Sequence, residues 1–143
     1  MRMIASDAGP RILLIEDAPA TAAIFQLYVE ELGLSDPVWV ESLDEAEEMV
    51  PRIAAGQFDV IVSDLLLNDR DAGAFLGRVV AETGCPVVVC TGSPDAARRR
   101  ELAGCTVLTK PVSFDGLAAV LSRWRIPPGP AGRVDACTRA RAV

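Results

Sequence analysis

The stretch "FDVIVSDLLLND", residues 58–69, is the most apolar part of the chain, and it contains a carboxylate. Val60, Ile61 and Val62 are β-branched residues of the kind that fill a central strand. Asp64 comes two residues later and is followed at once by three leucines. We therefore expect a rigid, buried strand that ends at Asp64 and holds a reactive side chain at its tip.

The rest of the chain alternates between similar strand-like segments and segments with helical spacing. Further strands are predicted at residues 11–17, 37–40, 85–92 and 105–110. Five helices are predicted between and after these strands. The first covers residues 19–33, the second follows a capping box at Ser42 and Glu45, and the third contains Phe75, Leu76, Val79 and Val80. The fourth begins at Ser93, Pro94 and Asp95, and the fifth runs from Phe114 to Trp124.

Two details of these helices are open to a structural check. In residues 19–33 we expect Ile24, Leu27, Tyr28 and Leu32 to share the buried face. Pro51 should kink or shorten the helix that follows Ser42, because proline lacks the amide N–H that a helix interior needs.

This alternation predicts an α/β fold with a five-stranded parallel sheet, doubly wound, and helices on both faces. The flavodoxin-like strand order 2-1-3-4-5 is the common arrangement for such a chain. Residues 10–126 would form the domain. Residues 1–9 would be an N-terminal extension, and residues 127–143, rich in Pro, Gly and Arg, a flexible tail.

Composition narrows the class of protein. The 143 residues suit a single domain, and a net charge of −6 argues against broad nucleic-acid binding, which needs a basic surface. No apolar run approaches the roughly 18–20 residues of a membrane span, and the N-terminus lacks a signal-peptide core. The four cysteines form no CxxC pair and histidine is absent, which argues against zinc. We expect reduced, mostly buried cysteines and a cytoplasmic protein.

Reactive side chains follow four of the five predicted strands. Open parallel sheets bind ligands beyond the carboxyl ends of their strands. The side chains expected there are Glu16 and Asp17 on the first strand, Asp64 on the third, Thr91 on the fourth and Lys110 on the fifth. The predicted strand order would gather them in one pocket.

Three carboxylates in one pocket call for a cation. Two carboxylates ~4 Å apart repel each other by about 4 kcal/mol at an effective dielectric of ~20. An all-oxygen site suits Mg²⁺, and the same pocket could then hold a phosphoryl group on Asp64, the central carboxylate. The ammonium of Lys110 and the hydroxyl of Thr91 would meet the phosphoryl oxygens.

Four motifs resemble the receiver domain of two-component response regulators: "RILLIED" (11–17), "VIVSDLLL" (60–67), "VVVCTGS" (87–93) and "VLTKP" (107–111). The resemblance implies that a histidine kinase or a histidine phosphotransfer protein phosphorylates Asp64. It also implies Mg²⁺ bound by Asp17, Asp64 and the backbone carbonyl of Leu66, with Glu16 acting through water. Thr91 would be the switch hydroxyl, Lys110 the phosphate-pairing residue, and the peptide before Pro111 would be cis.

The sequence departs from the family pattern in three places. Val107 stands three residues before Lys110, where the family usually has its switch aromatic. The sequence "NDRDAG" (68–73) replaces the Pro-Gly that usually follows the phosphorylated Asp. The stretch from Thr91 to Lys110 is a few residues shorter than usual in the family, which implies a trimmed fourth helix. All three lie on the side that signals to a downstream target protein. The resemblance also implies a possible homodimer through the fourth helix, fifth strand and fifth helix.

Simpler interpretations stay open. Glu16 and Asp17 could cap the helix at Pro19, and Arg98, Arg99 and Arg100 could form a solvated helix face. An aspartyl phosphotransferase of the haloacid-dehalogenase type would want Asp-x-Asp after a strand, which Asp64 does not provide. A degenerate receiver that only binds proteins is the main alternative. A stand-alone receiver or the N-terminal part of a longer regulator would both fit.

Overall fold

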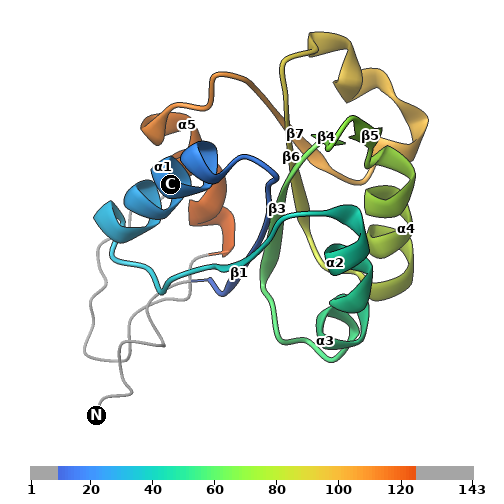
Figure 1. The fold of residues 1–143 in the computed structure, drawn as a ribbon, viewed down its shortest axis with the longest axis horizontal. Helices are drawn as coiled ribbons and strands as arrows, with labels where there is room; N and C mark the ends of the chain where they lie inside the picture. The colour runs from blue at the N-terminus through green and yellow to red at the C-terminus, as the bar shows by residue number, and fades with distance from the viewer. Residues whose placement is uncertain (1–9, 125–143) are drawn as a thin grey trace.

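The computed structural model describes residues 10–124, and its centre is one five-stranded parallel sheet (Figure 1). The strands are β1 (Ile12–Ile15), β2 (Val38–Val40), β3 (Val60–Asp64), β6 (Val87–Thr91) and β7 (Thr106–Thr109). Their order is β2-β1-β3-β6-β7, which is 2-1-3-4-5 among the strands of this sheet. The predicted fold class and strand order are confirmed.

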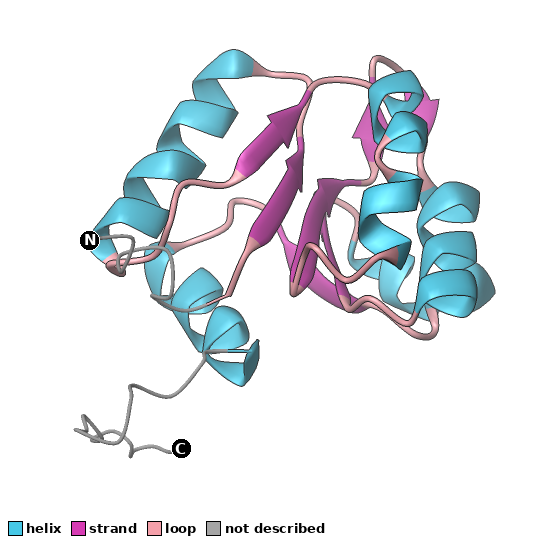
Figure 2. Ribbon diagram, turned by 90° about the horizontal axis from the view of Figure 1, so that it is seen from below, coloured by secondary structure: helices cyan, strands magenta, loops and turns pink. Residues whose placement is uncertain are grey.

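Helices cover both faces of the sheet (Figures 1 and 2). The helices α1 (Pro19–Glu31) and α5 (Phe114–Leu121) lie on one face, and α2 (Leu43–Glu48), α3 (Val50–Ala54) and α4 (Gly73–Thr83) lie on the other. Alternate strand residues enter separate cores, with Ile12 and Leu14 on the α1 side and Leu13 and Ile15 on the α4 side. Burial on both faces explains why the strands are continuously apolar.

The buried face of α1 differs from the prediction. Its buried residues are Ala22, Phe25 and Val29, whereas Ile24 and Leu27 are 49% and 59% exposed. Tyr28 and Leu32 pack only at the edge of the core. Apolar side chains lie on more than one side of this helix, so that its spacing is compatible with two faces, and contact with the sheet selects one of them.

The segment after β2 begins and breaks where the sequence predicts. Ser42 Oγ accepts a hydrogen bond from the Glu45 N–H (3.1 Å), and the Glu45 carboxylate accepts one from the Glu41 N–H (2.6 Å). The first helix of the segment ends at Glu48, and α3, with Pro51 in its first turn, begins at Val50. Both the cap at Ser42 and the effect of Pro51 are confirmed.

The helix predicted to follow β6, from Ser93 onward, is replaced by two short 3-10 helices, Pro94–Arg98 and Arg100–Leu102. Ser93 does not cap the first of them with its side chain; its backbone N–H instead donates to Thr91 Oγ1 (3.1 Å). The predicted trimmed fourth helix is therefore present only as these two short segments. The last helix also shortens, because α5 ends at Leu121 and continues as the 3-10 turn Ser122–Trp124.

A small hairpin follows Asp64, at the place where the family pattern has a Pro-Gly pair. Strands β4 (Leu66–Leu67) and β5 (Arg70–Asp71) pair antiparallel. The two residues between them, Asn68 and Asp69, have φ angles of 52° and 65°. A two-residue turn with both φ angles positive suits the twist of a hairpin, and Asn and Asp tolerate that conformation better than most residues.

Other expectations concern cysteines, membranes and the chain ends. Cys85 and Cys90 are buried free thiols and Cys105 is a half-buried one, as predicted. Among residues 10–124, no helix has the length and apolar character to cross a membrane. Cys137, the predicted extension (residues 1–9) and the predicted tail (residues 127–143) lie outside the described residues, as do residues 125 and 126 of the predicted domain.

Gly77 supports a testable statement about packing. A Cβ at Gly77 would lie 2.4 Å from the carbonyl oxygen of Glu101, which is impossible without backbone movement. We expect Gly77→Ala to lower the free energy of unfolding by about 1–3 kcal/mol, the usual cost of overpacking, although alanine favours helices. Urea denaturation measures this. Gly92→Ala, where a Cβ meets nothing within 4 Å, is the control, and equal effects would contradict the assignment.

Candidate functional site

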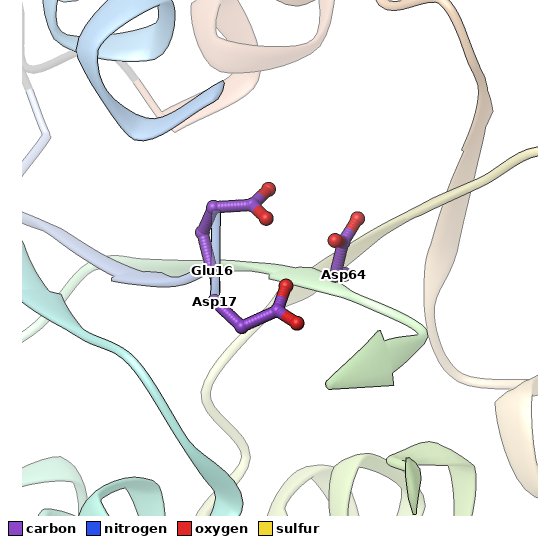
Figure 3. A group of neighbouring side chains, drawn as sticks. All are labelled: Glu16, Asp17 and Asp64. Carbon is purple, nitrogen blue, oxygen red and sulfur yellow. The ribbon is translucent and has the colours of Figure 1, made fainter. Parts of the chain in front are cut away.

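Three carboxylates meet at the carboxyl ends of β1 and β3 (Figure 3). Glu16 and Asp17 follow β1, and Asp64 is the last residue of β3. In the parallel pairing of these two strands, Ile15 of β1 lies opposite Ser63 of β3. One oxygen from each carboxylate lies within 4.8 Å of the others. Glu16 and Asp64 are buried and Asp17 is partly exposed. The parallel register of two strands is therefore what assembles the acidic group.

Lys110 supplies the positive charge of the site. It follows β7, and its ammonium forms a close ion pair with Oδ1 of the Asp64 carboxylate. Its backbone N–H donates to the carbonyl of Thr91 (2.7 Å), which ties the ends of β6 and β7 together. The Lys110–Pro111 peptide is cis, as the sequence resemblance implied.

Thr91 lies at the end of β6, the strand next to β3, and is buried. Its hydroxyl oxygen accepts the Ser93 N–H, so the hydroxyl is joined to the loop that leads into the first 3-10 helix. The five side chains singled out in the sequence thus lie at one edge of the sheet, on four neighbouring strands.

Burial and charge change the proton affinity of two of these groups. Burial raises the pKa of Glu16 to about 7, and the nearby Asp64 charge adds to this, against a hydrogen bond from the Ala18 N–H (3.1 Å). For Lys110, burial lowers the pKa, but the hydrogen bond and charge of Asp64 outweigh it and the net shift is upward. Burial thus favours the neutral form of Glu16, whereas Asp64 favours the charged form of Lys110.

The hydrogen bonds at the end of β1 correct one sequence interpretation. Ala18 is the N-cap of α1, without any side-chain cap bond, and it is Glu16 that accepts the Ala18 N–H. Asp17 instead accepts the Asn68 N–H from the hairpin tip (2.9 Å). Asp17 is therefore no helix cap; its carboxylate faces the acidic group and the hairpin.

Two contacts of the site are absent from the sequence analysis. The first is the hairpin contact to Asp17, for which the only sequence signal is the Asn68-Asp69 pair. The second is Trp39, whose indole N–H donates to the backbone carbonyl of Glu16 (2.8 Å). Nothing in the sequence distinguishes Trp39 from an ordinary packing residue, because its partner is a main-chain atom on another strand.

The donor set fits a hard divalent cation. All three side chains offer carboxylate oxygens, which Mg²⁺ prefers, and they lie close enough to share one ion. Oδ1 of Asp64 is buried and, within residues 10–124, has no hydrogen-bond partner beyond its ion pair with Lys110. A carboxylate oxygen can accept more than one partner, so Oδ1 can bind a cation in addition to the Lys110 ammonium.

A cavity of about 520 Å³ adjoins Asp64 and gives the site space on the α1 side. Its charged edge is formed by Glu16, Asp64 and Lys110, and its walls are mainly apolar, with Ile24, Phe25 and Tyr28 from α1. The carboxylate of Asp64 is thus held in a rigid strand but remains open to an incoming group.

Comparison with known proteins agrees with this geometry. The family model "Response regulator receiver domain" matches residues 12–122, so the chain belongs to the response regulator receiver family of two-component signalling. The sensor protein GacS of Pseudomonas syringae pv. syringae is 28% identical over 128 residues, which cover 83% of this chain and 14% of that protein. The chain spans 14% to 31% of the curated relatives it matches.

Solved structures share the fold. The receiver domain of sensor histidine kinase PA1611 from Pseudomonas aeruginosa PAO1, which has a magnesium ion in its active site cleft, is 25% identical, with a TM-score of 0.65. The match covers 82% of this chain and 98% of that one. The CheY-like receiver domain from Methylobacillus flagellatus, 23% identical, has a TM-score of 0.67 and covers 81% and 98%, and shows the fold alone.

The raised pKa of Glu16 predicts how stability varies with pH in the absence of divalent metal. A carboxyl whose pKa rises on folding, here from 4.5 to about 7, stabilises the fold fully below pH 4.5. This contribution is lost as the pH rises through 7. It should amount to about 2 kcal/mol between pH 5 and 8.

Chemical denaturation in EDTA at several pH values measures this slope. Glu16→Gln, which cannot ionise, should flatten the profile over that window. Glu45→Gln, at an exposed capping position away from the site, is the control and should keep the wild-type slope. A wild-type profile that rises from pH 5 to 8 would show that Glu16 is not the dominant group.

Proposed function

We propose that this chain is a phospho-accepting receiver: Asp64 takes a phosphoryl group in a Mg²⁺-dependent reaction, and the resulting conformational change is recognised by a downstream target protein. The observation that carries the proposal is the buried Asp64 oxygen, ion-paired with Lys110 and without another partner in residues 10–124. It sits at a strand end beside two further carboxylates.

The donor would be a histidine kinase or a histidine phosphotransfer protein. An oxygen of Asp64 attacks the phosphorus of the donor's phosphohistidine, a P–O bond forms as the P–N bond breaks, and the imidazole leaves and takes up a proton from water. Family membership supports this partner class. The chain itself has no histidine, so it cannot be the phosphohistidine donor.

Glu16, Asp17, Asp64 and the backbone carbonyl of Leu66 are the groups proposed to hold Mg²⁺, with Glu16 acting through water. The close approach of the three carboxylate oxygens supports this, as does the magnesium ion in the related PA1611 receiver. When bound, Mg²⁺ supplies positive charge that neutralises the phosphoryl oxygens in the transition state.

Thr91 and Lys110 have separate proposed roles. The ammonium of Lys110 already contacts Asp64 and would stay with the phosphoryl oxygens once the carboxylate is esterified. Thr91 would donate its hydroxyl to a phosphoryl oxygen, and because that hydroxyl also accepts the Ser93 N–H, the bond would pull on the loop before the 3-10 helices.

The remaining expectations belong to the same proposal. Residues 10–126 would be the receiver domain, acting in the cytoplasm without nucleic-acid contact or membrane insertion. A homodimer would use the two 3-10 helices, β7 and α5, which stand where the fourth helix, fifth strand and fifth helix are expected.

A phosphorylation assay tests the chemistry directly. Incubation with acetyl phosphate and Mg²⁺ should add one phosphoryl group, seen by intact mass, and Asp64→Asn should abolish it because the nucleophile is gone. Asp59→Asn, the control, replaces an acid that pairs with Arg11 at the other end of β3 and should still accept the group. Thr91→Ala should also be phosphorylated, since nucleophile and metal ligands remain. No mass gain in the wild type would favour the degenerate binding module.

Val107 generates a prediction about switching. It is half-buried on β7 where the family pattern has an aromatic, and valine has too little apolar surface to fill the space that a ring would fill. We expect beryllofluoride, a phosphoryl mimic, to alter amide exchange strongly at residues 91–95 and weakly at residues 105–108. Equal changes in both segments would show that another residue, such as Leu108 or Trp124, performs the ring's movement.

A further inference from the structure

Arg99 connects the two 3-10 helices to the hairpin beside the acidic site. Its Nη1 and Nη2 atoms donate to Oδ2 and Oδ1 of Asp71, both at 2.8 Å, and Nη2 also donates to Glu101. The guanidinium is 30% exposed, whereas its neighbour Arg98 is 83% exposed and pairs only locally, with Asp95. The predicted solvated face therefore holds for Arg98 and Arg100 but not for Arg99.

The Arg99 contact differs from an ordinary surface ion pair. Single exposed pairs contribute little, but a two-pronged guanidinium–carboxylate pair within a network is geometrically specific. The Asp71 carboxylate is also held by the Gly73 N–H, which donates to Oδ1 (2.7 Å). The hydrogen bonds from Arg99 lower the pKa of Asp71, so this carboxylate stays charged.

The hairpin between Asp64 and Asp71 is held at both ends. At its tip the Asn68 N–H donates to Asp17 Oδ2 (2.9 Å), and at its base Asp71 is held by Arg99. Leu66, whose carbonyl is a proposed metal ligand, lies in its first strand. Any movement of the base therefore displaces groups that belong to the acidic site.

The segment that carries Arg99 is pressed against α4. A Cβ at Gly73 would lie 2.4 Å from Nη2 of Arg99, and a Cβ at Gly77 would lie 2.4 Å from the carbonyl oxygen of Glu101. The two glycines are four residues apart and so share one face of the helix. Residues 99–101 therefore lie directly against the first turns of α4, which links the position of this segment to that of the helix.

We propose that Arg99 is a positioning residue that fastens the hairpin over the acidic pocket and couples occupancy of the pocket by Mg²⁺ to the order of residues 94–102. This inference rests on the proposed metal site. The coupling is reciprocal: if the Arg99–Asp71 pair favours the hairpin position that binds the ion, then the bound ion favours the Arg99–Asp71 pair. In a chain with Val107 on β7, this route reaches the 3-10 helices without an aromatic switch.

A Mg²⁺ titration of the 143-residue chain tests the first half. Trp39 bonds to the Glu16 carbonyl and so reports on the pocket, and a Trp124→Phe background leaves it as the one tryptophan. We expect Arg99→Gln to weaken Mg²⁺ binding about 3- to 10-fold, the range of a modest coupling energy. Arg99→Lys, which keeps the charge without the fork, should lie between. Arg98→Gln, the matched control, should stay within about twofold of the parent.

Amide hydrogen exchange tests the second half. In the parent protein, saturating Mg²⁺ should slow exchange in both the hairpin and residues 94–102. In Arg99→Gln it should slow exchange only in the hairpin, a difference that a general loss of stability would not produce. Asp71→Asn combined with Arg99→Gln should weaken binding no further than the stronger single variant, because both remove one interaction.

The outcomes of these experiments distinguish failure of the Arg99 coupling from failure of the proposed function on which it rests. A parent protein that binds no Mg²⁺ overturns both. Normal Mg²⁺ binding in the parent with the same affinity and protection in Arg99→Gln overturns the coupling and leaves the proposed function standing. If Arg99→Gln does not fold, Arg99→Lys and Asp71→Asn decide, and parent-like affinity and protection in both overturn the coupling.

Discussion

The ion pair between Asp64 and Lys110 is the interaction on which the rest of the site depends. A central strand ends in a buried carboxylate, which an apolar core alone would not tolerate, and one ammonium from the edge strand balances it. Burial raises the pKa of Glu16 to about 7, and the Asp64 charge adds to this, so a second ionised carboxylate here is unfavourable without a cation. This charge balance supports the proposed binding of a cation and of a phosphoryl group in the pocket.

The five side chains of the site are present, whereas the segments around them depart from the family pattern. The acidic group, the hydroxyl and the ammonium all lie on rigid strand ends. The departures lie next to them: a hairpin in place of Pro-Gly, two 3-10 helices in place of an α-helix, and Val107 in place of a ring. In the proposed function, strand ends would set the geometry of phosphoryl transfer and connecting segments the surface that partners contact, so the two could vary separately.

The hairpin and the two 3-10 helices contact each other and α4 closely, although their own structure is irregular. Gly73 and Gly77 allow residues 99–101 to approach α4 closely, and Arg99 carries that contact on to the hairpin. A glycine in a helix interior ordinarily costs stability relative to alanine. At Gly77 the loss is offset by a close approach of the Glu101 backbone that a Cβ would block, which gives this glycine a structural reason.

Sequence alone determined the strand order and the meeting of five polar side chains at one edge, because these follow from apolar periodicity and from parallel strand ends. The cis peptide followed from motifs resembling a family. Tertiary structure alone decided which side of α1 is buried, since apolar residues there permit two faces. It also decided that Arg99 pairs with Asp71, 28 residues away, and that Trp39 holds the Glu16 carbonyl. Contacts between distant segments, and contacts to main-chain atoms, leave no local pattern in a sequence.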